Sequence, residues 1–515
     1  MAAVFMLWKK QQRWLPFWQT EMLKFQQSLA ELLYAGAALD PSAIAIEQGD
    51  QTLSYEELLC RVESVAATLL KKYPEPGSRI GLCATNHVDH LIAYLAILLA
   101  GIIWVPINPA NGRALNTVIA EKVQPNVILV DSESVANAPG SDLLLLLDDL
   151  TGANGNFQPS CPDLDDIAAI KFTGGTTGEP KGVLQTHSNM LAVIENMQAF
   201  YKFNQLDCNL VIAPLTHGSS HFILPILAVG GRHRFLPDRS AESIIGALDS
   251  GVTTAFMPPT LIYKLLDADS LAPGKFNDLR HLTYGAAPML PGRISEAQRM
   301  FGPCISTIYG QTEAPMMITA LTAEEMQDAA LCGTVGRTCR NIQIRIVNEE
   351  NGVLPVGTSG SIEVSGPIVM PGYLNNPLST AATIREGWLR TGDLGYIDAS
   401  GYLTIVGRAS DLIITGGFNV YPTEVENILA EAPGVSECCV FGVEDPYWGE
   451  RIDAVIVLSS VTVEDKEKIV AFVRERLGAI RTPKNFYVTQ AIPRNGVGKV
   501  VRRDMPDFIK SLQAL

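Results

Sequence analysis

Residues 173–182 constrain this chain more than any other part of its sequence. They read Thr-Gly-Gly-Thr-Thr-Gly-Glu-Pro-Lys-Gly and follow an apolar run, residues 166–172, that is typical of a strand. Glycines let backbone N–H groups turn toward one anion, hydroxyls add donors, and a lysine adds positive charge. The pattern predicts a polyphosphate loop at the end of a strand. It is not a Walker A loop, because Lys181 is followed by glycine and not by serine or threonine.

Runs of strand length alternate with helical patterns over about residues 40–330. Residues 78–84 and 101–107 are expected to be buried strands on either side of an apolar helix that begins near His90. This alternation predicts parallel sheets covered by helices. Between residues 336 and 405 the pattern changes to short strands and turns, which indicates a β-rich subdomain.

A further boundary is expected at residues 407–411, because the residues that follow have helix and strand patterns of their own. We therefore expect an α/β chain with two domains. The large one, residues 1–406, would contain two helix-covered sheets and the β-rich subdomain. The small one, residues 412–515, would be a mobile α+β domain.

Composition limits the function classes. An apolar fraction of 47% is enough for a large core, and scattered basic residues with a net charge of −15 argue against a nucleic-acid partner. Nine cysteines without a Cys-x-x-Cys pair predict free thiols in a reducing compartment. No apolar run is long enough to span a membrane. We expect a cytoplasmic protein, either a monomer or a homodimer.

The first 21 residues are unusual, since aromatic and basic side chains interleave over residues 8–18. Two interpretations are open. The segment contacts a membrane surface, or it is an extension that packs on the domain, with Met22 as the natural start. We favour the second.

Several further motifs carry chemistry. Residues 309–313 read Tyr-Gly-Gln-Thr-Glu and follow an apolar strand, a position that suits a nucleotide site in an α/β crevice. A carboxylate there suits a hard cation bound to phosphate. Residues 387–395 place Asp393 in a glycine-containing turn, where its two oxygens could accept from two hydroxyls. Near the end of the chain, residues 493–500 place Lys499 in another glycine-containing loop.

The order of these motifs, from residue 53 to Lys499, resembles the adenylate-forming superfamily of acyl-CoA synthetases, peptide-synthetase adenylation domains and firefly luciferase. Two positions depart from the family pattern. Gly174 stands where a serine is usual in the phosphate loop, and Ser410 stands at the expected hinge, where aspartate or lysine is usual.

The resemblance implies a role for each motif residue. Tyr309 would stack on adenine, Thr312 would bond the α-phosphate, Glu313 would hold Mg²⁺, and Asp393 and Arg408 would contact the ribose. The residues implied in ATP binding are Thr173, Gly174, Gly175, Thr176, Thr177, Gly178, Lys181, Gly285, Ala286, Ala287, Tyr309, Gly310, Gln311, Asp393 and Arg408.

Four residues are implied in catalysis: Lys499, Thr312, Glu313 and His217. Lys499 would bridge the carboxylate and the α-phosphate, and His217 would form a gate between the phosphates and the acyl pocket. His187 and His221 are expected to be structural.

For a second half-reaction, residues 416–422 and 448–451 resemble segments near CoA in CoA ligases. They would contribute Gly416, Gly417 and Trp448. A tryptophan offers a flat apolar surface for adenine or pantetheine. Its alternative role is packing within the small domain.

The expected activity is that of an acyl-CoA synthetase using ATP, Mg²⁺ and CoA on a hydrophobic fatty or aryl carboxylic acid. Rotation at residues 407–411 would exchange Lys499 for the CoA face. The alternatives are a ligase that passes acyl-AMP to a carrier protein or an amine, a luciferase-like oxygenase, and a catalytically silent nucleotide-binding homologue.

Overall fold

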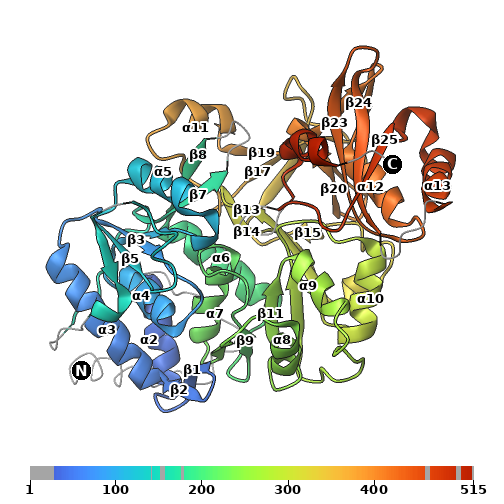
Figure 1. Cartoon of the computed structure of the whole chain (residues 1–515). Coiled ribbons are helices and arrows are strands. Elements are labelled where there is room, and N and C mark those ends of the chain that lie inside the picture. Colours follow the sequence, from blue (N-terminus) through green and yellow to red (C-terminus); the bar gives the residue numbers. More distant parts are fainter. Residues whose placement is uncertain are drawn as a thin grey trace.

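The computed structural model describes residues 28–140, 142–150, 157–174, 179–458, 464–494 and 500–512. Two large sheets lie side by side in its N-terminal part, with helices packed against them (Figure 1). A third, smaller sheet follows, and a fourth belongs to the C-terminal elements drawn in orange and red.

The six-stranded sheet carries the predicted phosphate segment and has the order β6-β5-β3-β4-β7-β8. Its strands from β6 to β7 run parallel, and β8 returns antiparallel to β7. The bounds are β3 Arg79–Cys83, β4 Ile103–Pro106, β5 Val127–Val130, β6 Leu144–Leu146, β7 Ile167–Gly174 and β8 Pro180–Thr186.

The nine-stranded sheet has the order β15-β14-β13-β12-β11-β9-β10-β1-β2. Its middle is parallel, and antiparallel strands close both edges. The bounds are β1 Ile44–Gln48, β2 Gln51–Ser54, β9 Cys208–Leu210, β10 Arg232–Phe235, β11 Thr254–Met257, β12 His281–Tyr284, β13 Ile305–Gln311, β14 Ala314–Leu321 and β15 Arg337–Thr338.

The helices around these sheets follow their apolar patterns. The helix α4 is buried on nearly every face and lies in a core shared with α2, α3 and parts of α6 and α7, which explains its almost unbroken apolar sequence. A capping box of Ser54 and Glu57 starts α3. The bounds are α2 Leu29–Leu39, α3 Tyr55–Lys72, α4 Val88–Leu99, α5 Arg113–Val123, α6 His187–Tyr201, α7 Ile223–Leu227, α8 Ala241–Leu248, α9 Pro259–Leu266 and α10 Pro291–Phe301.

The predicted β-rich subdomain is a five-stranded sheet ordered β16-β17-β19-β18, with β20 on β19. The bounds are β16 Gln343–Val347, β17 Gly360–Ser365, α11 Pro377–Thr383, β18 Ile384–Arg385, β19 Trp388–Ile397 and β20 Leu403–Arg408.

The C-terminal elements have cores of their own, in which strands β21, β23, β24 and β25 pack on α12, α13 and α14. The bounds are β21 Ile413–Thr415, β22 Phe418–Val420, α12 Pro422–Ala430, β23 Val435–Asp445, β24 Gly449–Leu458, α13 Glu464–Arg481, β25 Asn485–Thr489 and α14 Met505–Phe508. No described helix is long and apolar enough to cross a bilayer. All nine cysteines lie in described residues and are free thiols.

Candidate active site

The β7–β8 hairpin places the two ends of the phosphate loop. Thr173 lies opposite Lys181 in the ladder, and Gly174 lies opposite Pro180. The Lys181 ammonium lies 5.2 Å from the ring centroid of Tyr373. The tyrosine hydroxyl donates to Glu313 Oε1 at 2.9 Å. The fold therefore brings the predicted phosphate lysine and the predicted metal ligand to the same aromatic side chain.

The four central loop residues, Gly175, Thr176, Thr177 and Gly178, lie outside the described residues, as does Lys499. The ends of the Lys499 loop are placed by a bridge between Arg494 and Val500. The roles expected for these five residues therefore remain predictions.

The segment 309–313 forms the end of β13 and the turn into β14. A Cβ on Gly310 would lie 2.4 Å from the backbone nitrogen of Met316, so the two strands meet where only glycine fits. The Thr312 carbonyl accepts a hydrogen bond of 3.0 Å from Gln185 Nε2, which ties this turn to β8. This contact fixes the distance between the two predicted phosphate-binding segments.

Two predicted nucleotide-binding residues contact the carboxylate of a third. The Tyr309 hydroxyl donates to Asp393 Oδ2 at 2.6 Å, and Arg408 Nε lies 3.1 Å from Asp393 Oδ1. Burial and then the nearby Asp393 charge raise the pKa of Tyr309 well above its usual value, so its hydroxyl stays protonated and donates. Strands β13, β19 and β20 supply one residue each.

The predicted gate lies at the start of a short 3₁₀ turn, Gly218–Phe222. Thr216 Oγ1 and His217 Nδ1 are 2.9 Å apart. Burial, and secondly the charge of Lys171, lower the pKa of His217 to about 4, so its ring is uncharged near neutral pH.

Three chain segments near the predicted gate are in contact with one another. A Cβ on Gly218 would lie 2.9 Å from the Phe256 ring and 3.4 Å from Met316 Sδ, and one on Gly285 would lie 3.1 Å from the same ring. Ala286 adopts a left-handed backbone, with φ of 68°, which a small side chain tolerates best. Small residues and two large apolar side chains therefore meet here.

The expected CoA residues are partly brought together. The Gly416 N–H donates to the Trp448 carbonyl at 2.8 Å, and a Cβ on Gly416 would lie 3.1 Å from the indole. Lys484 Nζ lies 4.9 Å from the centroid of the same indole. Gly417 follows with a left-handed φ of 81°, and a Cβ there would meet nothing within 4 Å.

Two site residues were missed from sequence. Tyr373 belongs to no motif, and its contact with Glu313 arises only because the loop after β17 folds against β13. Lys171 carried a usable signal: it is the only charged residue between Ile167 and Phe172, an otherwise apolar strand.

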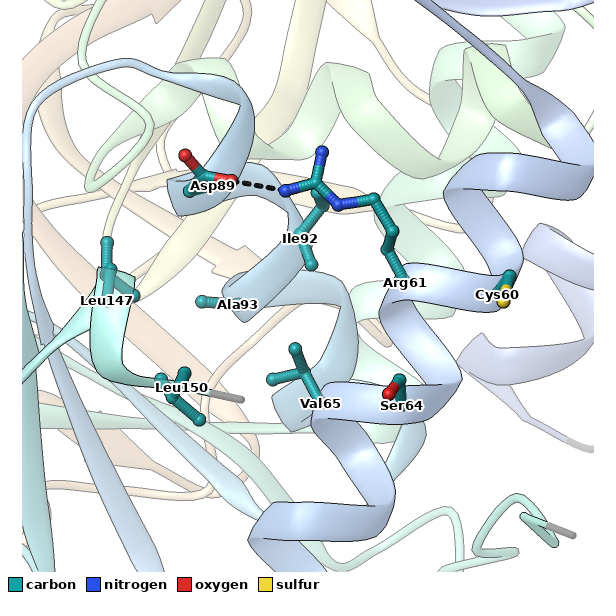
Figure 2. A pocket seen from close by; sticks show the side chains of 9 residues that line it. All are labelled: Cys60, Arg61, Ser64, Val65, Asp89, Ile92, Ala93, Leu147 and Leu150. Atoms are coloured by element: carbon teal, nitrogen blue, oxygen red, sulfur yellow. Dashed lines mark hydrogen bonds and ion pairs between the residues drawn. The ribbon is translucent and has the colours of Figure 1, made fainter. Parts of the chain in front are cut away.

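A hollow of about 230 Å³ between α3 and α4 lies apart from these groups (Figure 2). The Arg61–Asp89 ion pair, 2.6 Å long, spans one side of it, and apolar side chains such as Val65, Ala93 and Leu150 face it. None of the predicted site residues lines it, so we assign it no role in the chemistry.

The residues present fit the expected ligands. The amide Nε2 of Gln311 is buried and has no hydrogen-bond partner among the described residues, which leaves a donor for a nucleotide beside Tyr309. Glu313 is one partly exposed carboxylate, and no described cluster of three metal-binding side chains exists. A single carboxylate with substrate phosphates is how Mg²⁺ is commonly held.

Comparison with known proteins decides the family. The sequence profile of the AMP-binding enzyme family matches residues 33–374, and that of the AMP-binding enzyme C-terminal domain matches residues 424–499. The chain belongs to the AMP-binding enzyme family. The expected membership, α/β fold and ligase class are confirmed.

Among characterised AMP-binding enzymes, the chain is 35% identical to the medium/long-chain-fatty-acid–CoA ligase FadD8 of Mycobacterium tuberculosis, over 68% of this chain and 64% of FadD8. It is 32% identical to feruloyl-CoA synthase of an Amycolatopsis species, over 91% of this chain and 96% of the synthase. The amide bond synthetase McbA of Marinactinospora thermotolerans has a similar structure, with a TM-score of 0.84, 25% identity, and coverage of 93% of this chain and 99% of McbA.

Proposed function

We propose that this AMP-binding enzyme is an ATP-dependent carboxylic acid–CoA ligase that acts on a hydrophobic acid. The observation that carries the proposal is the meeting of Lys181 and Glu313 at Tyr373, beside the Tyr309–Asp393–Arg408 group. These groups provide a cation for phosphate, a carboxylate for a metal, and acceptors for a ribose within one site.

In the first half-reaction, a substrate carboxylate attacks the α-phosphate of ATP and pyrophosphate leaves, giving acyl-AMP. Both reactants are anionic, so the protein must position them and neutralise their charge. Lys181 and Thr173 would hold the phosphates, Asp393 would orient the ribose, and Lys499 would approach the carboxylate. Mg²⁺ bound at Glu313 would supply further charge neutralisation at the phosphates.

The tail of the carboxylic acid substrate is expected to be apolar. It would lie among Gly218, Gly285, Phe256 and Met316, which contact one another and carry no charge. His217 is uncharged near neutral pH, so it would separate the phosphates from this pocket without trapping the carboxylate as an ion pair.

In the second half-reaction, the CoA thiol would attack the acyl carbonyl and release AMP. The Gly416–Trp448 contact provides a flat aromatic surface beside a glycine backbone, which suits a pantetheine arm. The relatives named as CoA ligases support this acceptor. The similarity to an amide bond synthetase keeps an amine acceptor as the second candidate.

Mass spectrometry on the purified protein tests the proposal, with Mg·ATP and a panel of fatty, aryl and amino acids, with and without CoA. We expect acyl-CoA from one hydrophobic acid class. Acyl-AMP that accumulates despite CoA would favour the amine or carrier acceptor, and absence of both products would refute ligase activity toward the panel.

Two variants test whether the reaction takes place at this site. Glu313→Gln removes the charge at the predicted metal position, so pyrophosphate release should fall roughly a hundredfold or more. Glu324→Gln is the matched control, since Glu324 is exposed, and it should retain full activity. Equal rates for the two variants would remove Glu313 from the mechanism.

A further inference from the structure

A lysine lies buried in the strand that leads to the phosphate loop. Lys171 is 6% exposed, although lysine is one of the residues least often buried. Its Nζ lies 2.9 Å from His221 Nε2, 3.5 Å from Ser220 Oγ, and 5.0 Å from the centroid of the Trp104 ring. These contacts come from β4 and from the turn that follows His217.

The Lys171 ammonium has no carboxylate partner in the described part of the chain. No Asp or Glu whose side chain is described contributes to the pKa of Lys171, which burial alone lowers to about 7. Burying a cation without a counter-ion costs free energy, and an apolar residue would fill this position without that cost.

The contacts of Lys171 lead to the gate. Ser220 and His221 belong to the Gly218–Phe222 turn, and Ser220 Oγ donates to the His217 carbonyl at 2.8 Å. Lys171 also precedes Thr173 by two residues, so both side chains are on the same face of β7. One side chain therefore connects the strand of the phosphate loop with the turn of the gate.

We propose that Lys171 is a positioning residue that fixes the His217 turn to the phosphate strand and places positive charge behind the gate. The inference rests on the proposed function and extends it to a residue that no motif contains. Its charge opposes protonation of His217, because two cations close together in a buried site repel each other. Among described residues, the titratable groups near the gate are Lys171 on β7 and His221 on the gate's own turn.

The first test compares Lys171→Met with Lys171→Arg. In the Met variant, the acid limb of kcat/KM for the carboxylic acid should move to higher pH by roughly half a unit or more, because His217 protonates more easily. KM for the acid should rise about tenfold, while KM for ATP stays within about twofold. Lys171→Arg keeps the charge and the donors, so it should leave the acid limb where it is in the parent enzyme.

Two further variants separate positioning from folding. Ser220→Ala removes the hydroxyl between Lys171 and the His217 carbonyl, so it should raise KM for the acid without moving the acid limb. Lys264→Met is the control, because Lys264 is exposed on α9, and it should change neither quantity. If Lys171→Met lowers activity by the same factor at every pH and in both half-reactions, the inference is overturned and Lys171 has a structural role only.

A measurement without turnover keeps this inference distinct from the proposed function. The pKa of His217 can be followed by NMR of ¹⁵N-labelled histidine in the parent protein and in Lys171→Met, with His217→Gln to assign the signal. A higher His217 pKa in Lys171→Met is expected even if no acid in the panel is activated. An unchanged pKa would refute the role of Lys171, whatever the enzyme's substrate.

Discussion

The buried Lys171 should make the stability of the protein depend on pH. Burial lowers its pKa from 10.5 to about 7, so between these values the unfolded chain binds more protons than the folded one. Stability should therefore rise with pH across this window, and the cost of the buried lysine is largest below pH 7. We expect Lys171→Met to have a higher melting temperature than the parent protein at pH 6, and this gain should shrink as the pH approaches 10. Thermal denaturation at several pH values measures it.

The same variant should thus be more stable and less active, which is the pattern expected of a functional residue kept at a stability cost. A Met variant that is less stable than the parent at pH 6 would show that the contacts with His221 and Ser220 outweigh the cost of burial.

At the residue scale, the sequence singles out candidate residues where a motif is local. Tyr309 and Glu313 belong to one short pattern. The structure places Tyr309 against Asp393 and Glu313 against Tyr373, and their roles toward adenine and Mg²⁺ remain predictions. The contacts of Tyr373 and His221 could not be predicted, because each depends on an element far away in the chain.

At the scale of elements, the β13–β14 hairpin depends on Gly310. A Cβ there would lie 2.4 Å from the Met316 nitrogen, and a backbone atom cannot rotate away as a flexible side chain can. Gly310→Ala should therefore destabilise the protein by about 1–3 kcal/mol and weaken ATP binding. Chemical denaturation and isothermal titration with ATP measure the two effects.

Gly292→Ala in α10 is the matched control, because its Cβ would meet nothing within 4 Å. Alanine favours a helix over glycine, so this variant should be as stable as the parent or slightly more stable. If Gly310→Ala matched it, the hairpin would be able to widen and the close approach would not be essential.

The strands of the structure extend beyond the apolar runs that mark them in the sequence. The apolar strand expected before the 309–313 motif is β13, Ile305–Gln311, which extends into the motif because its polar end still pairs with β14. Leu144–Leu146 forms the short strand β6 at the edge of the six-stranded sheet. Strand β23 runs from Val435 to Asp445, beyond the apolar residues 438–442, since pairing with β24 continues after burial ends.

At the scale of the whole molecule, the predicted hinge lies between two anchored side chains. Arg408 is held by Asp393 in the large unit, at 3.1 Å. Asp411 is held by Arg502 of the C-terminal elements, also at 3.1 Å, and Arg502 in turn pairs with Glu426 at 2.6 Å. Only Ala409 and Ser410 lie between the two anchors, so we propose that rotation of the C-terminal unit is absorbed there.

A proline at this pivot tests the proposal. Ser410→Pro fixes φ near −65° and restricts the backbone of Ala409, so the unit should be limited to a narrower range of orientations. Because the two half-reactions would need different orientations, we expect one of them to slow about tenfold or more while the other stays within about twofold. Pyrophosphate release measures the first, and thioester formation from supplied acyl-AMP measures the second. Ser410→Ala keeps the backbone free and should leave both rates unchanged. If the proline variant changes the rates of both half-reactions by the same factor relative to the parent, the pivot lies outside residues 409–410 or one orientation serves both steps.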